Sequence, residues 1–104
     1  MKIKKYAAID IGSNAIRMLI SNVIKHKKEN TILKNALVRV PIRLGEDSFT
    51  SGSISKKNIN MIIKSMKAFK ILMKVHGVKK YIVFATSALR EAENSDKVIK
   101  EVLI

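Results

Sequence analysis

Residues 6–14 read Y-A-A-I-D-I-G-S-N, and this stretch, Tyr6–Asn14, decides the fold class that we predict. Its apolar first part predicts a short buried strand, and Gly12-Ser13-Asn14 predicts a tight turn at the end of that strand. The strand places the Asp10 carboxylate near its C-terminal end.

The same turn has the composition of a phosphate site. Gly12 permits either a positive φ or a close approach of the main chain to a ligand. Ser13 and Asn14 add a hydroxyl and an amide beside backbone N–H groups, and Asp10 is available to a magnesium ion or its waters. A purely structural Asx turn would show the same pattern, so this stretch alone leaves both interpretations open.

Two further strands follow in the sequence. Ala15–Ile24 is apolar on alternate positions, Lys25–Asn30 is a polar connection, and Thr31–Ile42 alternates again, which predicts a three-stranded antiparallel meander. Lys34 interrupts the apolar face of the last strand. Residues 43–55 are rich in Gly, Ser, Thr and Asp without periodicity and predict an ordinary loop, although Gly45-Glu46-Asp47 and Gly52 could also turn over a pocket.

A helix, a strand and further helical segments complete the order. Ser55 is the expected N-cap of a helix and Gly77 its C-terminal stop. Tyr81–Ala85 predicts a buried parallel strand. Apolar residues recur at helical spacing between the caps: Ile59, Ile62, Ile63, Met66, Phe69 and Met73. With a short helix capped by Thr86-Ser87 and a last one from Asp96, the order βββαβα predicts an α/β domain with a crossover between parallel strands.

Length and composition limit the class of protein. A chain of 104 residues forms at most one small domain, and no apolar run reaches the roughly 18 residues of a membrane span. The basic N-terminus is not followed by an unbroken apolar segment, as a secretory signal requires, and cysteine is absent. We therefore expect a cytoplasmic protein without a membrane partner. The end, Val102-Leu103-Ile104, suggests a domain that stops early.

The charge is strongly positive. The chain has 21 basic and 8 acidic residues, a formal net charge of +13, which attracts polyanions such as polyphosphate, nucleotides or nucleic acid. Seventeen of the 21 cations are lysine, so compositional drift in an AT-rich genome explains much of this charge. Aromatic residues make up 5% of the chain and do not interleave with the lysines, which argues against a stacking platform for nucleic acid.

A second motif, Ala85–Ala92, reads A-T-S-A-L-R-E-A. Thr86 and Ser87 lie at a predicted strand end and helix start, where free N–H groups favour anions. Arg90 follows about one turn later and can present its planar guanidinium to phosphate oxygens. A simple cap followed by a surface arginine is the alternative.

Other polar residues receive no site role. Glu91 and Glu93 are expected to be solvated, with Glu93 and Lys97 forming a helical ion pair four residues apart. His26 and His76 have no spacing typical of metal ligands.

Together the two motifs resemble the N-terminal part of the exopolyphosphatase / guanosine pentaphosphate phosphohydrolase (Ppx/GppA) family. The resemblance runs from Tyr6–Asn14 through Arg43-Leu44-Gly45-Glu46 to Ala85–Ala92. It implies a partial actin-like ATPase (ribonuclease H-like) domain, in which residues 1–104 are the first part of domain I, and the rest of domain I and domain II are absent. It also implies a hydrolase that releases terminal phosphate from polyphosphate or guanosine pentaphosphate with Mg²⁺, and homodimeric full-length relatives.

The resemblance also assigns roles to residues. Asp10 would organise the metal, while Asn14 and Arg90 would be the catalytic contacts to the terminal phosphate. Gly12, Ser13, Thr86 and Ser87 would complete the phosphate-binding set. The family's general-base glutamate lies in a later segment resembling I-S-G-x-E-E-A, which these residues do not contain. We therefore expect this chain alone to be a poor or inactive hydrolase. The alternatives are a catalytically incompetent phosphate-binding or polyanion-binding fragment and, less favoured, a small RNA-binding protein.

Overall fold

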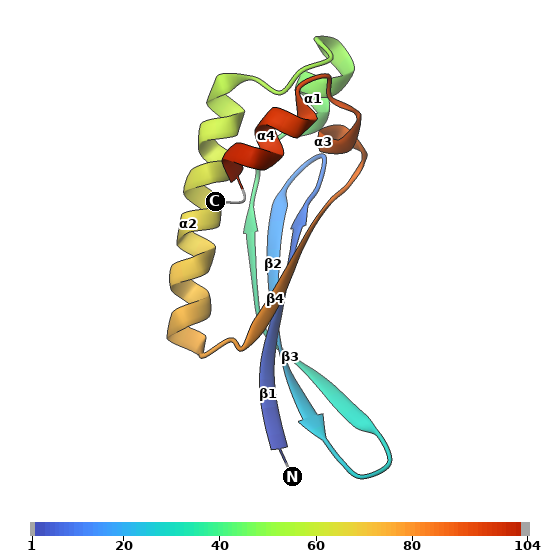
Figure 1. Ribbon diagram of the computed structural model, residues 1–104, viewed down its shortest axis with the longest axis vertical. Helices are drawn as coiled ribbons and strands as arrows, with labels where there is room; N and C mark the ends of the chain where they lie inside the picture. Colours follow the sequence, from blue (N-terminus) through green and yellow to red (C-terminus); the bar gives the residue numbers. More distant parts are fainter. Residues whose placement is uncertain (1, 103–104) are drawn as a thin grey trace.

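The computed structural model of the chain describes residues 2–102, apart from the side chain of Ser48. Four strands form one mixed sheet in the order β3-β2-β1-β4. Helix α2 lies along the sheet, and the short helices gather at the end where the β1–β2 turn lies (Figure 1). The elements are β1 (Lys2–Ile11), β2 (Ile16–Lys25), β3 (Asn30–Val40), α1 (Leu44–Thr50), α2 (Lys56–His76), β4 (Lys80–Ala85), α3 (Ser87–Glu91) and α4 (Ser95–Val102).

The strand pairing confirms the predicted meander and the parallel fourth strand. β2 pairs antiparallel with both β1 and β3, whereas β4 runs parallel to β1. Parallel neighbours need a crossover connection, which α2 supplies. β1 begins at Lys2 rather than at Tyr6, because Lys2 pairs with Lys25 and extends the hairpin.

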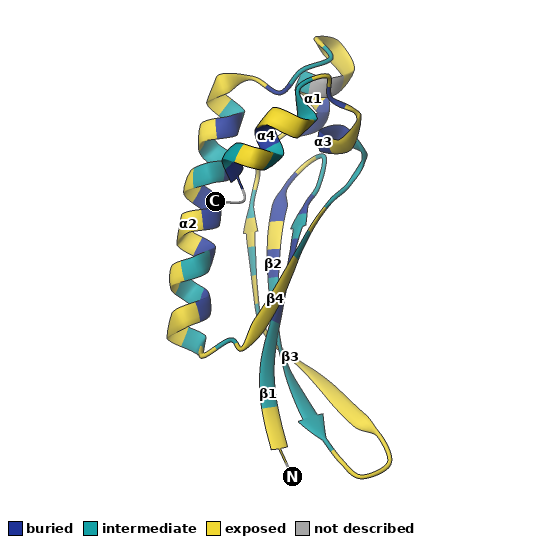
Figure 2. Ribbon diagram, viewed as in Figure 1, coloured by how far each residue is buried: buried dark blue, intermediate teal, exposed yellow. Residues whose placement is uncertain are grey.

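The core lies between one face of the sheet and α2. Alternate residues of β1 and β2 point to this covered face, since side chains alternate along a strand. Figure 2 shows the buried positions of α2 on its side toward the sheet. The largest fully buried side chains are Phe69, Ile9, Ile16, Met18, Ile20, Leu44, Ile62, Leu89 and Val98.

Both predicted ends of α2 are confirmed. The Ser55 hydroxyl accepts a hydrogen bond from the Asn58 backbone N–H at 3.2 Å, which satisfies one of the free donors of the first turn. Gly77 has φ 75°, and its N–H reaches the carbonyls of Lys74 and Met73. Only a residue without a β-carbon adopts this left-handed conformation at little cost.

The predicted loop over residues 43–55 is wrong in its first half, where α1 forms. Its sequence lacks helical periodicity, but tertiary contacts hold it, as is common for short helices. Leu44 is fully buried, and the Asp47 carboxylate accepts hydrogen bonds from the Ser55 N–H and the Asn58 side-chain amide, at 2.9 and 2.7 Å.

The prediction of burial for the fourth strand is also wrong. Tyr81, Ile82 and Phe84 are 46%, 63% and 46% exposed. β4 is an edge strand, and Val83 and Ala85 alone pack against the core. Tyr81 shares the face of Val83, whereas Ile82 and Phe84 lie on the other face of the sheet, which no described element covers. We call this the open face; its central residues are Ala8, Asp10, Arg17, Leu19, Leu37, Arg39, Ile82 and Phe84.

A β-bulge in β3 explains the interruption at Lys34. The pairing shifts between Ile20, opposite Ala36, and Ser21, opposite Lys34, so Asn35 is the extra residue. A bulge changes which residues share a face. Ile32 is therefore 70% exposed, on the same face as Lys34, whereas unbroken alternation would place it with Ala36 and Val38.

Helices α3 and α4 pack through four buried side chains, those of Ala88, Leu89, Val98 and Val102. The predicted final helix is confirmed as far as Val102, and the Leu103-Ile104 part of the predicted apolar end lies outside the described residues. None of the helices within residues 2–102 has the length and hydropathy of a membrane-spanning segment.

Candidate functional site

The turn between β1 and β2 is closed by its own backbone. The Gly12 N–H donates to the Ala15 carbonyl at 3.0 Å. A β-carbon at Gly12 would lie only 3.0 Å from that same oxygen, so the turn would have to shift to accept a side chain there. The positive-φ glycines of the described chain are Gly52 and Gly77. Gly12 is therefore required for a close approach of the backbone and not for a left-handed conformation.

A pocket of about 330 Å³ lies at this turn. Residues of the first motif and Thr86 of the second motif meet at this pocket. They meet because β4 runs parallel to β1, so the C-terminal ends of the two strands lie side by side. The Thr86 N–H and hydroxyl both donate to the Ile11 carbonyl, at 3.1 and 3.4 Å. The residues that line the pocket are Asp10, Gly12, Ser13, Asn14, Ala15, Arg17, Arg39 and Thr86.

Asp10 is the acidic residue of this pocket. One carboxylate oxygen, Oδ2, accepts a hydrogen bond from Arg17 Nη2 at 2.6 Å. The other, Oδ1, is buried and has no hydrogen-bond partner among the described residues. A buried carboxylate oxygen without a donor is unfavourable, so this atom is available to a cation or a donor that enters the pocket.

Arg17 and Arg39 line the pocket but were not among the residues predicted from the sequence. A signal for Arg17 existed: once the turn is placed between Ile11 and Ile16, antiparallel pairing sets Arg17 directly opposite Asp10. Arg39 lies opposite Arg17 on β3. The bulge near Asn35 lies between that position and the β2–β3 connection, so counting residues from the connection places Arg39 one position off.

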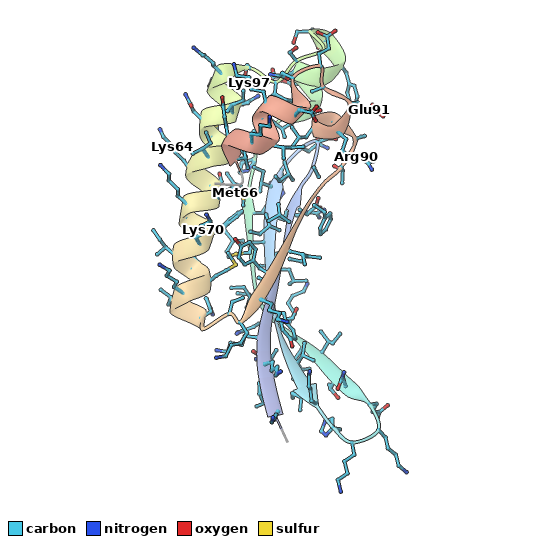
Figure 3. All side chains as sticks on the ribbon, in the orientation of Figure 1. Lys64, Met66, Lys70, Arg90, Glu91 and Lys97 are labelled. Atoms are coloured by element: carbon cyan, nitrogen blue, oxygen red, sulfur yellow. The ribbon has the colours of Figure 1, made fainter. Side chains whose placement is uncertain are left out.

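The remaining residues of the second motif lie beside the pocket without lining it. Ser87 begins α3, and Arg90 is exposed in its last turn. Figure 3 shows Arg90 projecting from α3 close to Glu91, at the end of the molecule that holds the β1–β2 turn. Thr86 occupies the N-cap position, but its side chain does not cap the helix as predicted, because its hydroxyl bonds Ile11 instead.

The predicted ordinary loop proves to be connected to the site. The Gly45 N–H, in the first turn of α1, donates to the Ser13 carbonyl at 2.9 Å. Partial burial works to raise the pKa of Asp47, but hydrogen bonds from Ser55 and Asn58 outweigh it, so its pKa lies below the ordinary value for aspartate. Asp47 thus joins α1 to the start of α2 as a carboxylate.

The expected Glu93–Lys97 helical pair is wrong, because Glu93 lies in the turn before α4. Its N–H donates to the Gly52 carbonyl at 2.7 Å, and its side chain lies against Gly52. Within residues 2–102 no three His, Asp or Glu side chains gather as a metal cluster.

The sequence of this chain is similar to those of known phosphatases. The sequence profile of the Ppx/GppA phosphatase family matches residues 19–103, a range that begins after the turn and includes the second motif. The bifunctional 3-dehydroquinate synthase/phosphatase of Fusobacterium nucleatum is 34% identical over 92% of this chain and 15% of its own length. Exopolyphosphatase 1 of Mycobacterium tuberculosis is 30% identical over 94% of the chain and 28% of its own length.

Solved structures show the same fold. The Aquifex aeolicus Ppx/GppA family member superposes with a TM-score of 0.83 at 26% identity, over 97% of this chain and 32% of that one. An exopolyphosphatase from Cytophaga hutchinsonii gives a TM-score of 0.79 at 25% identity, also over 97% and 32%. The predicted fold class, part of an actin-like ATPase domain, is thereby confirmed. The chain spans between 15% and 32% of the length of these relatives.

Proposed function

Since this chain belongs to the Ppx/GppA phosphatase family, we propose that its pocket binds the terminal phosphate of inorganic polyphosphate, which the whole enzyme hydrolyses. One observation carries the proposal: the Asp10–Asn14 turn and Thr86, from opposite ends of the chain, line the same pocket. The name of the mycobacterial relative, exopolyphosphatase 1, points to the same substrate.

Each residue has a proposed role that its chemistry supports. The Ser13 hydroxyl and the Asn14 amide donate to phosphate oxygens, and Gly12 keeps the turn narrow enough to present them. Thr86 fixes the end of β4 against β1. Ser87 and Arg90 follow on α3, where the guanidinium neutralises charge that develops on the phosphoryl group. The proposed catalytic contacts are Asn14 and Arg90.

The pocket fits a magnesium ion held by one carboxylate. Mg²⁺ commonly binds one or two carboxylates together with substrate phosphates and waters. Asp10 Oδ1 is the buried oxygen that lacks a partner, and it would be the protein ligand. A bound Mg²⁺ would supply charge neutralisation at the phosphate oxygens. The proposed cofactor is therefore Mg²⁺ with Asp10.

We further propose that the 104 residues alone bind polyphosphate without appreciable turnover, because no glutamate of the described chain lines the pocket as a general base. Guanosine pentaphosphate is the second substrate of this proposal, since it also ends in a phosphoanhydride. A cytoplasmic location remains a prediction from composition, and homodimers of the whole enzyme remain a prediction from the resemblance.

Calorimetric titration with tripolyphosphate and Mg²⁺, at about 150 mM salt to screen the general positive field, tests the proposal. Asn14→Ala should weaken binding about tenfold through the loss of a phosphate contact. Arg90→Ala should weaken it by a similar factor. Asn60→Ala, a matched asparagine on the exposed side of α2, should leave the Kd unchanged.

Two results would contradict the proposal. The first is equal binding by wild type, Asn14→Ala and Arg90→Ala. The second is stronger affinity for RNA than for tripolyphosphate, with a steep salt slope that both substitutions leave intact, as expected of a protein that binds through its net charge. An orthophosphate-release assay on the same samples tests the absence of turnover, and robust release would overturn that part.

A further inference from the structure

A row of three charged side chains crosses the sheet beside the pocket. Asp10 on β1 lies opposite Arg17 on β2, and Arg17 lies opposite Arg39 on β3. Directly opposed residues share a face and have β-carbons about 5 Å apart. All three line the pocket, on the open face of the sheet. The row therefore leads from the β1–β2 turn outward over β2 and β3.

The charges of this row do not balance. The single carboxylate of Asp10 is already in an ion pair with Arg17. Among the side chains that the structure describes, none forms an ion pair with Arg39. Two opposed cations destabilise a sheet unless an anion lies between them. The Arg17–Arg39 pair is thus an incomplete arrangement that an anionic ligand would complete.

The residue type also argues for a site. Only four of the 21 cations in the chain are arginine, and the rest are lysine. Compositional drift therefore fills exposed positions with lysine, yet both cations that line the pocket are arginine. Guanidinium groups match phosphate oxygens with two parallel hydrogen bonds, which an ammonium group does not.

We propose that Arg39 binds the phosphates that follow the terminal one, so that a polyphosphate chain leaves the pocket across β2 and β3 on the open face. This inference rests on the proposed function and adds a second anion subsite to it. In this proposal Arg39 contacts only the phosphates beyond the terminal one, so it would discriminate by chain length. Charge-assisted hydrogen bonds to one more phosphate supply the additional affinity.

The test compares orthophosphate with tripolyphosphate, each titrated calorimetrically into the full 104-residue chain with Mg²⁺. Arg39→Gln should weaken tripolyphosphate binding about tenfold and change orthophosphate binding less than twofold. Arg39→Lys keeps the charge but loses the planar fork, and should fall between wild type and Arg39→Gln. Lys74→Gln, which removes one cation from the exposed side of α2, is the matched control. Circular dichroism confirms that each variant is folded.

The outcomes separate the two proposals. A loss of tripolyphosphate affinity in Arg39→Gln that equals the loss in Lys74→Gln overturns the Arg39 subsite and leaves the proposed function standing. An equal loss for both ligands also overturns the subsite, because it places Arg39 at the terminal phosphate. Failure of wild type to bind either ligand overturns both proposals.

Discussion

The two faces of the sheet are built from the same four strands and differ in almost every respect. On the covered face, Ile9, Met18 and Ile20 are fully buried beneath α2. On the open face, Leu37 and Ile82 are 53% and 63% exposed. Figure 2 shows the same contrast along β3 and β4, whose outward positions are exposed. Alternation along each strand allows one sequence to serve both faces.

The two faces differ in what they contribute: the covered face contributes stability, and the open face holds the charged groups of the candidate site. Burial of apolar area stabilises the covered face. The open face carries the ion pair of Asp10 and Arg17, and Arg39, which has no ion-pair partner among the described side chains. A charged group can bind a ligand only where the ligand can reach it from solvent. The comparison predicts large losses of stability from changes on one side and small ones on the other.

The largest expected effect is at Phe69, which is 1% exposed between α2 and the sheet. Phe69→Ala should lower the free energy of unfolding by about 3–5 kcal/mol, the usual cost of removing a buried aromatic ring. Phe84→Ala, on the open face, is the matched control and should cost less than about 1 kcal/mol. Urea denaturation measures both. Equal losses would show that the two faces do not differ in the way described.

The next effect concerns the end of α2, on which the covered face depends. Gly77→Ala should cost about 1–2 kcal/mol, because alanine is strained at φ 75°. Among the described residues, no atom beyond the two chain neighbours lies within 4 Å of the added methyl group, so the cost is conformational and not steric. Gly77→Asn is the control, since asparagine tolerates this conformation better. A melting temperature that is lower for Gly77→Asn than for Gly77→Ala would contradict this explanation.

Asp47 should show a smaller effect that depends on pH. Its pKa is lowered on folding, so its stabilising contribution is present above about pH 4 and is lost as pH falls through the folded-state pKa. Asp47→Ala should cost about 1 kcal/mol at pH 7. Urea denaturation of wild type and variant between pH 7 and 3 should show the difference shrinking toward acid. A difference that stays constant over this range would exclude the carboxylate as its source.

The smallest effect is expected on the open face itself. Ile82→Thr should change the free energy of unfolding by less than about 0.5 kcal/mol, because the side chain is 63% exposed. Threonine keeps the branched shape that suits a strand. Ile62→Thr, at a fully buried position of α2, is the opposite control and should destabilise strongly. A large loss from Ile82→Thr in urea denaturation would mean that the open face is covered in solution.

The sequence predicted the elements with strong local signals. The caps at Ser55 and Gly77 were sufficient for α2, and the apolar run of β1 with the alternation in β2 was sufficient for the hairpin. It did not predict α1, since that helix depends on Leu44 packing and on Asp47 bonding to residues 8 and 11 positions later. It also misjudged β4, because an apolar run does not reveal whether one or both faces of a strand are covered.

The site was predictable to the extent that it is local. The turn from Asp10 to Asn14 is contiguous in the sequence, and a pocket lies at this turn. Arg17 could have been found by counting outward from the turn along both strands, which sets it opposite Asp10. Arg39 could not, because its register depends on the bulge at Asn35, for which the sequence gives no clear signal. The roles of all the candidate site residues remain predictions, and Ser87 and Arg90 in addition do not line the pocket.

The way the pocket is assembled has a consequence for folding kinetics. Asp10 and Arg17 are seven positions apart, whereas Thr86 and Ile11 are 75 apart. Hairpins close within about 1–10 μs, and long-range contacts wait for a costlier loop closure. A refolding chain should therefore form the Asp10–Arg17 ion pair early and complete the pocket only when β4 docks. The β1–β2 part of the site would therefore form before the part that β4 contributes.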